Sequence, residues 1–222
     1  MSGMPRFDHE SLAILQRQVT TNNEHSVDLK AFFYDTDSAD YSILKKYFKS
    51  VEINTIQKKD FNDIIVEKKA KESSINNVLS MYYSRFLALK DLENRDLDNF
   101  YDLSVYTRSD VFLSSRINYS KIIQNNIENK IYIPSGGDYR GINDKFCVCG
   151  LKIMKIYLGV YSEIFNYVDA GIEFHPETLQ YHHLKKMNVD IVRLSLNDFI
   201  FRGNDDILYG DYAVRKKYDG EI

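Results

Sequence analysis

The stretch from residue 101 to residue 110 reads Tyr-Asp-Leu-Ser-Val-Tyr-Thr-Arg-Ser-Asp, and it predicts a strand that runs into a polar turn. We expect the strand over residues 101–106, so that its end delivers Arg108, Ser109 and Asp110. Open α/β sheets bind their ligands at the carboxyl ends of their strands. This stretch therefore predicts both a strand of such a sheet and a candidate site at its end.

The rest of the chain alternates strand patterns with helix patterns. Strands are predicted over residues 29–34, 51–56, 131–134, 146–150 and 190–194. Helices are predicted over residues 11–21, 41–48, 75–93, 151–167 and 177–187. This alternation is typical of an α/β domain with a mostly parallel central sheet flanked by helices. We expect one domain over residues 1–222, with a polar tail from Arg202 that wraps the surface.

Composition excludes several classes of protein. A length of 222 residues with 44% hydrophobic residues suits one domain with a sizeable core. The net charge is -3 and the short basic runs are scattered, which argues against nucleic acid as the main partner. No stretch approaches the ~20 apolar residues of a membrane span. Cys147 and Cys149 are expected to be reduced, buried thiols, so we predict a cytoplasmic protein.

Arg108 and Asp110 allow two interpretations. An arginine presents a planar fork to phosphate oxygens, and an aspartate offers a hard oxygen ligand to Mg²⁺ or Mn²⁺. Together they suit a metal-bound diphosphate at the end of the strand. The alternative is an internal ion pair that closes the loop, and the tripeptide taken alone favours this ion pair.

Two further polar clusters follow other predicted strands. Residues 137–146 contain Asn143 and Asp144 beside two glycines, and a carboxylate there is a candidate general base, although an Asx-rich turn explains the same residues. His175-Pro176-Glu177 begins the last predicted helix. There is no HExxH, GxGxxG, Walker or GxSxG sequence, which argues against zinc hydrolases, dinucleotide enzymes, P-loop NTPases and α/β-hydrolases.

Taken in chain order, these segments resemble a family of short GT-A glycosyltransferases found in bacterial polysaccharide clusters and large DNA viruses, including the domain with which chloroviruses glycosylate their major capsid protein. The family carries an SGxPR turn, a "YDxxxRxRxD" strand, an "NDxF" segment and a "PExxxxxHL" helix. The matching segments are Ser2-Gly3-Met4-Pro5-Arg6, residues 101–110, Asn143-Asp144-Lys145-Phe146 and residues 176–184. The first arginine of the family's strand is replaced here by Tyr106.

The resemblance implies a single GT-A domain with a nucleoside-diphosphate sugar as donor, most commonly a UDP-sugar. It places Mn²⁺ or Mg²⁺ at Asp110 and Arg108 beside the phosphates. Gly3 and Arg6 would line the nucleotide pocket, and Arg85 would reach the diphosphate from its helix.

The resemblance also implies which residues face the acceptor. Asp144 would be the catalytic base and Glu177 the reserve, in an inverting transfer to a hydroxyl of a glycan or glycoprotein. Two carboxylates close together raise the pKa of one of them, which suits a base at neutral pH. A viral member would act in the host cytoplasm. A sugar nucleotidyltransferase and a GT-A module that binds its ligand without turnover are the alternatives.

Overall fold

The computed structural model of this chain describes most of the sequence. The described residues are 2–3, 9–20, 26–36, 40–48, 50–61, 72–97, 100–201, 207–209 and 212–214. The strands are β1 (Ser2–Gly3), β2 (Leu29–Tyr34), β3 (Val51–Ile56), β4 (Ser104–Thr107), β5 (Val111–Leu113), β6 (Lys130–Pro134), β7 (Phe146–Cys149), β8 (Asp190–Leu194), β9 (Asp198–Phe201), β10 (Ile207–Tyr209) and β11 (Tyr212–Val214). The helices are α1 (His9–Thr20), α2 (Ser42–Tyr47), α4 (Glu72–Glu93), α5 (Tyr119–Gln124), α6 (Leu151–Leu158), the 3₁₀ helix η1 (Gly159–Glu163), α7 (Ile164–Asp169) and α8 (Pro176–Lys186).

The first sheet has the order β1-β2-β3 and is parallel throughout. β2 pairs with β3 along its whole length, from Leu29 opposite Val51 to Tyr34 opposite Ile56. Nearly every side chain of β2 is buried, as expected for a parallel strand with helices on both faces. Residues of α1 and α2 pack on one face of this sheet, and α4 packs on the other.

The second sheet has the order β4-β7-β6-β8 and mixes both kinds of pairing. β7 is antiparallel to β4 and to β6, while β6 and β8 run parallel. Parallel strands require a crossover connection, and the chain makes it from β6 to β8 through β7 and the helices α6 to α8. The α/β class is confirmed, and the pairing is mixed rather than mostly parallel because β7 returns between β4 and β6.

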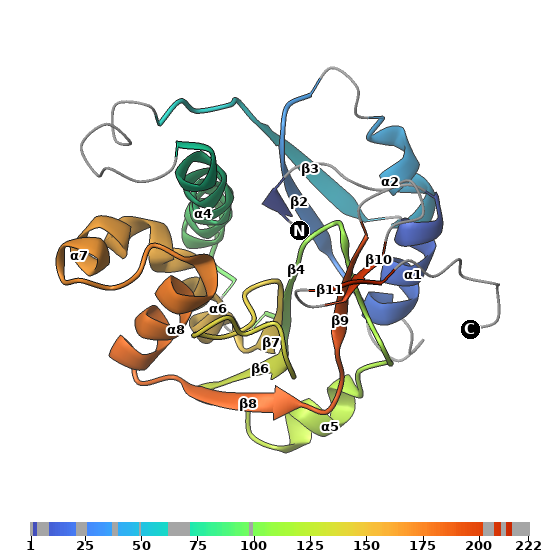
Figure 1. Cartoon of the computed structure of the whole chain (residues 1–222). Coiled ribbons are helices and arrows are strands. Elements are labelled where there is room, and N and C mark those ends of the chain that lie inside the picture. Colours follow the sequence, from blue (N-terminus) through green and yellow to red (C-terminus); the bar gives the residue numbers. More distant parts are fainter. Residues whose placement is uncertain are drawn as a thin grey trace.

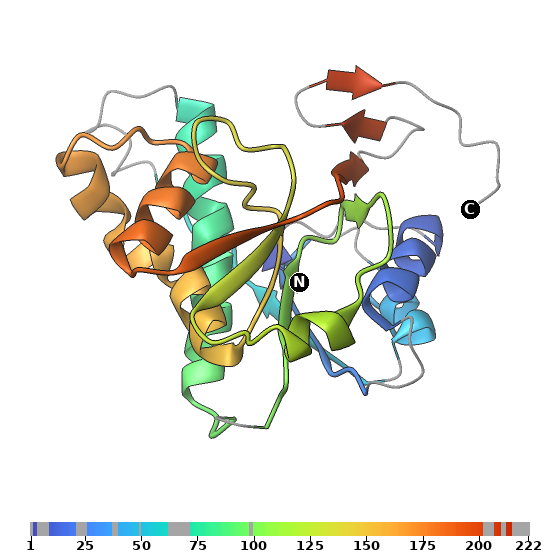
Figure 2. The ribbon, with the colours of Figure 1, turned by 90° about the horizontal axis from the view of Figure 1, so that it is seen from below.

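Helix α4 holds the two sheets together. Its 22 residues contact β1 and β2 of the first sheet and α6 of the layer that covers the second. Figures 1 and 2 show α4, α6, α7 and α8 gathered on one side of the strands, with α1 and α2 on the other. The strands thus form one layer between two layers of helices.

A third sheet is antiparallel and has the order β11-β10-β9-β5. Two of its strands, β10 and β11, lie in the segment after Arg202 that was predicted to wrap the surface as a polar tail. That prediction is wrong for residues 207–209 and 212–214, which pair as strands. The sequence did not reveal these two strands because each is only three residues long, which is too short to give a clear pattern.

The predicted helix over residues 151–167 is divided into α6, η1 and α7. The division begins at Gly159, a residue with low helix propensity. A side chain at this position would contact the His183 ring, 3.6 Å from its Nε2 atom. No helix among the described residues is long and apolar enough to cross a membrane.

Candidate functional site

Arg108 and Asp110 lie in the turn between β4 and β5. Arg108 Nε donates to Asp110 Oδ1 at 2.9 Å, and Arg108 Nη2 donates to Asp110 Oδ2 at 2.7 Å. The carboxylate side chain is 3% exposed, whereas the guanidinium side chain is 22% exposed. This geometry is the two-pronged ion pair that was one of the two interpretations of the tripeptide. Arg108 is therefore the more exposed partner of the pair.

Arg85 projects from α4 into the interior and is fully buried. Its Nε donates to Tyr106 Oη at 2.9 Å, and its Nη1 donates to Gln180 Oε1 at 3.0 Å. Its Nη2 donates to both the side chain and the backbone carbonyl of Asp144, each at 2.7 Å. The expectation that Arg85 reaches a diphosphate is therefore corrected, because its donors are used inside the protein.

Three tyrosine rings surround the Arg85 guanidinium. The ring centroids of Tyr82, Tyr106 and Tyr157 lie 5.0, 4.7 and 5.5 Å from its Cζ atom. Such ring faces attract a cation, most strongly where water is excluded. Tyr106, the departure from the family pattern, thus serves as both hydrogen-bond acceptor and ring partner for Arg85.

Asp144 was the first candidate for the catalytic base. Its carboxylate is almost fully buried and pairs with Arg85. Its backbone carbonyl accepts a further hydrogen bond from Tyr157 Oη at 2.6 Å. A carboxylate held in this way is a fixed negative charge rather than a group presented to a substrate. The structure therefore favours Glu177, the reserve candidate, as the base.

Glu177 is held beside residues 138–145 by a close backbone approach. Ile142 N donates to Glu177 O at 3.1 Å, and Tyr82 Oη donates to Pro176 O at 2.7 Å. A Cβ atom on Gly141 would lie 2.0 Å from Glu177 O, so only glycine fits at this position. The start of α8 and the segment that contains Asp144 are therefore fixed against each other.

The Glu177 carboxyl has an unusual environment. Burial, followed by the negative charge of Asp144, raises the pKa of Glu177 to about 7, although Lys145 and Arg85 oppose the rise. Its side chain is still 16% exposed. Glu177 Oε2 lies 2.8 Å from His175 Nδ1, but it makes no aligned hydrogen bond within the described part of the chain. A carboxyl with a shifted pKa and an unused buried acceptor is a candidate functional group.

A second polar group lies beside this carboxyl. Lys145 Nζ lies 3.1 Å from Asp198 Oδ2, and both side chains are buried. Asn143 Nδ2 donates to Asp198 Oδ1 and to Gly136 O. Gly137, at φ +68°, approaches Lys145 so closely that a Cβ atom would lie 2.6 Å from Nζ. Asn143 and Lys145 therefore shape the turn, and they leave the carboxylate of Asp144 directed to Arg85.

The remaining predicted residues are Gly3 and Arg6. Gly3 ends β1 and pairs with Phe33 of β2. Arg6 lies outside the described residues. Burial lowers the pKa of Arg108, but the pairing with Asp110 and, after it, the charge of Asp144 outweigh burial and raise that pKa, so the two arginine–aspartate pairs lie in one electrostatic neighbourhood.

A metal ion at Asp110 is not supported by a ready ligand set. In the described residues no group of three or more His, Cys, Asp or Glu side chains could hold a metal ion. Both carboxylate oxygens of Asp110 already accept hydrogen bonds from Arg108. These residues alone do not fit a divalent cation.

Two residues of the site were missed by sequence reasoning. Gln180 accepts from Arg85, and Asp198 pairs with Lys145. His175, which belongs to a polar cluster that the sequence did single out, lies against Glu177. Asp198 had a signal, since it is a charged residue at the start of the apolar run Asp198-Phe199-Ile200-Phe201. Gln180 had none, because its partner lies 95 positions away in the chain.

A scan against protein-family models and a search of curated proteins returned no match. Among solved structures, the apo form of mouse xyloside xylosyltransferase 1 is similar over 87% of this chain and 83% of that chain, with 10% sequence identity and a TM-score of 0.42. A score of this size describes a loose correspondence of elements, and even a shared fold does not fix a function. The site itself has to support any proposal of function.

Proposed function

We propose that this chain is a GT-A glycosyltransferase that moves a sugar from a nucleoside-diphosphate sugar to a hydroxyl of a glycan or glycoprotein. The observation that carries this proposal is the Glu177 carboxyl, with its pKa near 7 and its buried Oε2 without an aligned hydrogen-bond partner. A general base works best when its pKa lies near the working pH. The order of the sequence motifs supplies the choice of sugar transfer among the reactions that need such a base.

In the proposed step, the acceptor hydroxyl donates a hydrogen bond to the Glu177 carboxylate, whose side chain is 16% exposed. The proton passes to Glu177 as the hydroxyl oxygen bonds to the anomeric carbon of the donor sugar. The bond from that carbon to the diphosphate oxygen breaks, and its electron pair leaves with the nucleoside diphosphate. Attack opposite the leaving group inverts the configuration of the anomeric carbon.

Asp144 and Arg85 are positioning residues in this proposal. The buried Arg85 fixes the Asp144 carboxylate in place, and burial together with the charge of Asp144 raises the pKa of Glu177. A buried charge is tolerated only when it is paired. The effect of Asp144 on the pKa of Glu177 therefore depends on Arg85. Glu177 alone is proposed to contact the acceptor.

Arg108 is proposed to bind the donor phosphates through the exposed side of its guanidinium. Binding of Mn²⁺ or Mg²⁺ at Asp110 is a separate proposal. It requires Arg108 to release a carboxylate oxygen, and it requires the donor phosphates to supply further oxygen ligands. The proton transfer to Glu177 does not depend on it.

The donor is tested first by thermal shift with UDP-, GDP- and dTDP-sugars and the free nucleoside diphosphates. We expect stabilisation by one nucleotide, and UDP is the first to test. An absence of stabilisation by all of them would contradict the proposal. The nucleotide that binds then defines the donor for acceptor assays.

The base is tested by the Glu177→Gln variant in an acceptor-dependent transfer assay. We expect kcat to fall by about 10²- to 10⁴-fold, because the variant loses general base catalysis but keeps the shape of the side chain. For the unchanged chain, kcat/KM should rise with pH up to about pH 7 and then level off, as Glu177 loses its proton.

The Asp144→Asn variant is the matched control. Removing the negative charge should move the rising part of the pH profile to lower pH while transfer continues. If Asp144→Asn instead abolishes transfer and Glu177→Gln retains it, Asp144 is the base and the assignment of roles is reversed.

A further inference from the structure

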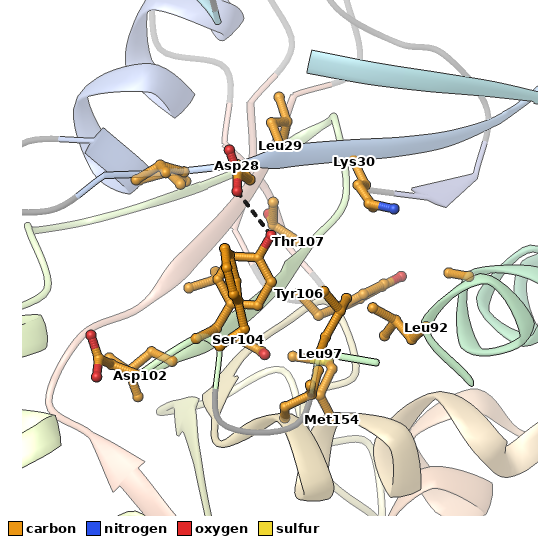
Figure 3. A pocket seen from close by; sticks show the side chains of 18 of the residues that line it. Asp28, Leu29, Lys30, Leu92, Leu97, Asp102, Ser104, Tyr106, Thr107 and Met154 are labelled. Carbon is orange, nitrogen blue, oxygen red and sulfur yellow. Dashed lines mark hydrogen bonds between the residues drawn. The ribbon is translucent and has the colours of Figure 1, made fainter. Parts of the chain in front are cut away.

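A cavity of about 540 Å³ lies between β2 and β4, apart from the proposed base. Figure 3 shows Leu29 of β2 on one side of it, with Leu92, Leu97 and Met154 on the other. Glu177 and the two arginine–aspartate pairs are not part of its lining. An acceptor whose hydroxyl meets Glu177 therefore binds outside this cavity, on the surface at the start of α8.

An exposed tyrosine ring lies close to Glu177 on this surface. Tyr139 is 45% exposed, and its ring stacks on the His175 ring with the centroids 3.9 Å apart and the planes at 26°. His175 Nδ1 in turn lies 2.8 Å from Glu177 Oε2. We call the two rings the Tyr139–His175 stack. Tyr139 is thus one ring away from the proposed base, and His175 covers only one of its two faces.

The turn that carries Tyr139 is fixed at both ends. Gly141 N donates to Asp138 O at 2.6 Å and closes the turn. Asp138 Oδ1 accepts a hydrogen bond from Arg193 Nη1 at 2.7 Å. At the other end, Gly141 lies directly against the backbone of Glu177. The turn therefore holds the Tyr139 ring at a defined position relative to the Glu177 side chain.

The two central residues of this turn have an unusual backbone conformation. Tyr139 has a φ of +25° and Arg140 has a φ of +56°. Glycine and asparagine adopt such angles readily, whereas the Cβ atom of a larger residue crowds the backbone there. Bulky residues held in this region cluster at functional sites. The turn thus presents two large side chains beside Glu177 at a cost to stability.

The groups around the stack suit a sugar ring. The face of an aromatic ring is negative, and it attracts the C–H groups on the apolar face of a pyranose. Arg140 Cζ lies 5.9 Å from the Tyr139 ring centroid, and Arg140 pairs with Glu173. The Arg140 and Glu173 side chains are 74% and 45% exposed, so they offer a donor and acceptors to sugar hydroxyls. An apolar surface with a few polar groups is the usual composition of a ligand site.

We propose that the Tyr139–His175 stack is the acceptor subsite, and that the acceptor hydroxyl belongs to a pyranose ring of a glycan rather than to a protein side chain. This inference rests on the proposed function, because it takes Glu177 as the base. The apolar face of the sugar lies on the exposed face of Tyr139, and one hydroxyl reaches the Glu177 carboxylate. Tyr139 binds the acceptor and takes no part in proton transfer.

The chain has no tryptophan, so a single tryptophan introduced at the stack reports on binding there. Tyr139→Trp keeps an aromatic face. Phe100→Trp is the matched control, because Phe100 is 69% exposed, pairs with the Tyr101 ring and lines the cavity instead of the candidate site. Methyl glycosides of glucose, galactose and mannose are titrated, and sorbitol, N-acetylserinamide and uridine are the comparison compounds.

We expect at least one glycoside to change the tryptophan emission of Tyr139→Trp and to protect it from quenching by acrylamide. Sorbitol has hydroxyls but no ring face, so it should have no effect. The absence of a response to every glycoside would overturn the proposal, and so would an equal response to sorbitol, to N-acetylserinamide or in Phe100→Trp. A response to uridine alone would also overturn it, because the stack would then bind the donor.

Tyr139→Asn separates acceptor binding from stability, because asparagine tolerates a positive φ. In the transfer assay, KM for the acceptor should rise about tenfold, while kcat and the thermal shift caused by the nucleotide stay unchanged. Tm should not fall, since the variant relieves the crowded backbone. A lower Tm with an unchanged KM would show that Tyr139 has a structural role only, and would overturn the proposal.

Failure of this inference and failure of the proposed function give different results. If Glu177→Gln abolishes transfer but no sugar binds the stack, the acceptor subsite is wrong and the transferase stands. If glycosides bind the stack but no nucleotide stabilises the chain, the sugar-binding surface stands and the transferase is wrong.

Discussion

Two arginine–aspartate pairs lie near each other in this protein and differ in almost every respect. Arg85 and Asp144 are 59 positions apart in the chain, and their side chains are 0% and 4% exposed. Arg108 and Asp110 are two positions apart, and the Arg108 side chain is 22% exposed. Arg85 has further acceptors in Tyr106 and Gln180.

The comparison shows that the same two residue types can either stabilise the fold or be available to bind a ligand. The Arg85 pair connects α4, α8 and the segment before β7, so ligand binding through it would require its internal bonds to break. The Arg108 pair is formed within one turn, and a ligand phosphate can approach its guanidinium from solvent. We therefore assign the first pair to positioning and the second to the donor.

Replacing each arginine by methionine should give the largest difference in stability between the two pairs. Arg85→Met leaves the Asp144 charge buried and unpaired, so we expect the free energy of unfolding to fall by about 3–5 kcal/mol. Arg108→Met removes a partner whose side chain is 22% exposed but also leaves the buried Asp110 carboxylate, so a smaller loss of about 1–3 kcal/mol is expected. Urea unfolding measures both. Equal losses would show that the two pairs have the same structural role.

The pH dependence of stability tests whether folding raises the pKa of Glu177, through burial and then the charge of Asp144. The pKa of Glu177 rises from 4.5 to about 7 on folding, so the folded state holds the proton more tightly. Stability should therefore fall as pH increases from 4.5 to 7, by on the order of 2 kcal/mol, and then stay level. Urea unfolding at pH 5 and pH 7.5 should show this loss in the unchanged chain and not in Glu177→Gln. An identical loss in both would contradict the assignment.

Arg108→Met should also weaken nucleotide binding. This variant therefore tests the proposed role of the Arg108 pair in binding the donor. Loss of one charge-assisted contact to phosphate should raise the Kd for the nucleoside diphosphate about tenfold. Isothermal titration calorimetry measures this change. Arg108→Lys keeps the charge without the planar fork, so its Kd should lie between the two. An unchanged Kd in Arg108→Met would remove Arg108 from the donor site.

The smallest expected effect concerns the metal at Asp110. If Mn²⁺ adds to the site, it should increase the Tm gain caused by the nucleotide by about 2–4 °C, as a modest gain in binding free energy would. Asp110→Asn should lose that increment and keep the gain from the nucleotide alone. An increment of equal size in Asp110→Asn would place the metal elsewhere.

The sequence predicted the elements that have strong local patterns. β2, β3 and β8 were predicted to the residue, and α4 was predicted apart from its first turn. These elements are either buried runs or long amphipathic repeats, whose signals lie within the element itself. β5 and β9 were missed because each has only three or four residues and pairs with a distant partner.

In the candidate site, too, local contacts could be predicted from the sequence and contacts between distant residues could not. The Arg108–Asp110 pair was one of two alternatives drawn from the tripeptide, because both partners lie in one turn. The partners of Arg85 come from β4, α8 and the segment before β7, and no local pattern shows which groups meet there. For this reason the sequence did not show that the Asp144 carboxylate is paired. The motif predicted a carboxylate at Asp144, but the arginine that donates a hydrogen bond to this carboxylate lies on another element.

Strand β7 has a practical consequence through its two thiols. Cys147 and Cys149 are free, fully buried and part of one core cluster, and burial raises the pKa of Cys149 well above its usual range. Alkylating reagents attack the thiolate, so neither sulfur should react until the sheet opens. The rate of thiol labelling then reports the opening of the β4-β7-β6-β8 sheet in the native protein. This chain thus carries its own reporter residues for fold stability, and no cysteine has to be introduced.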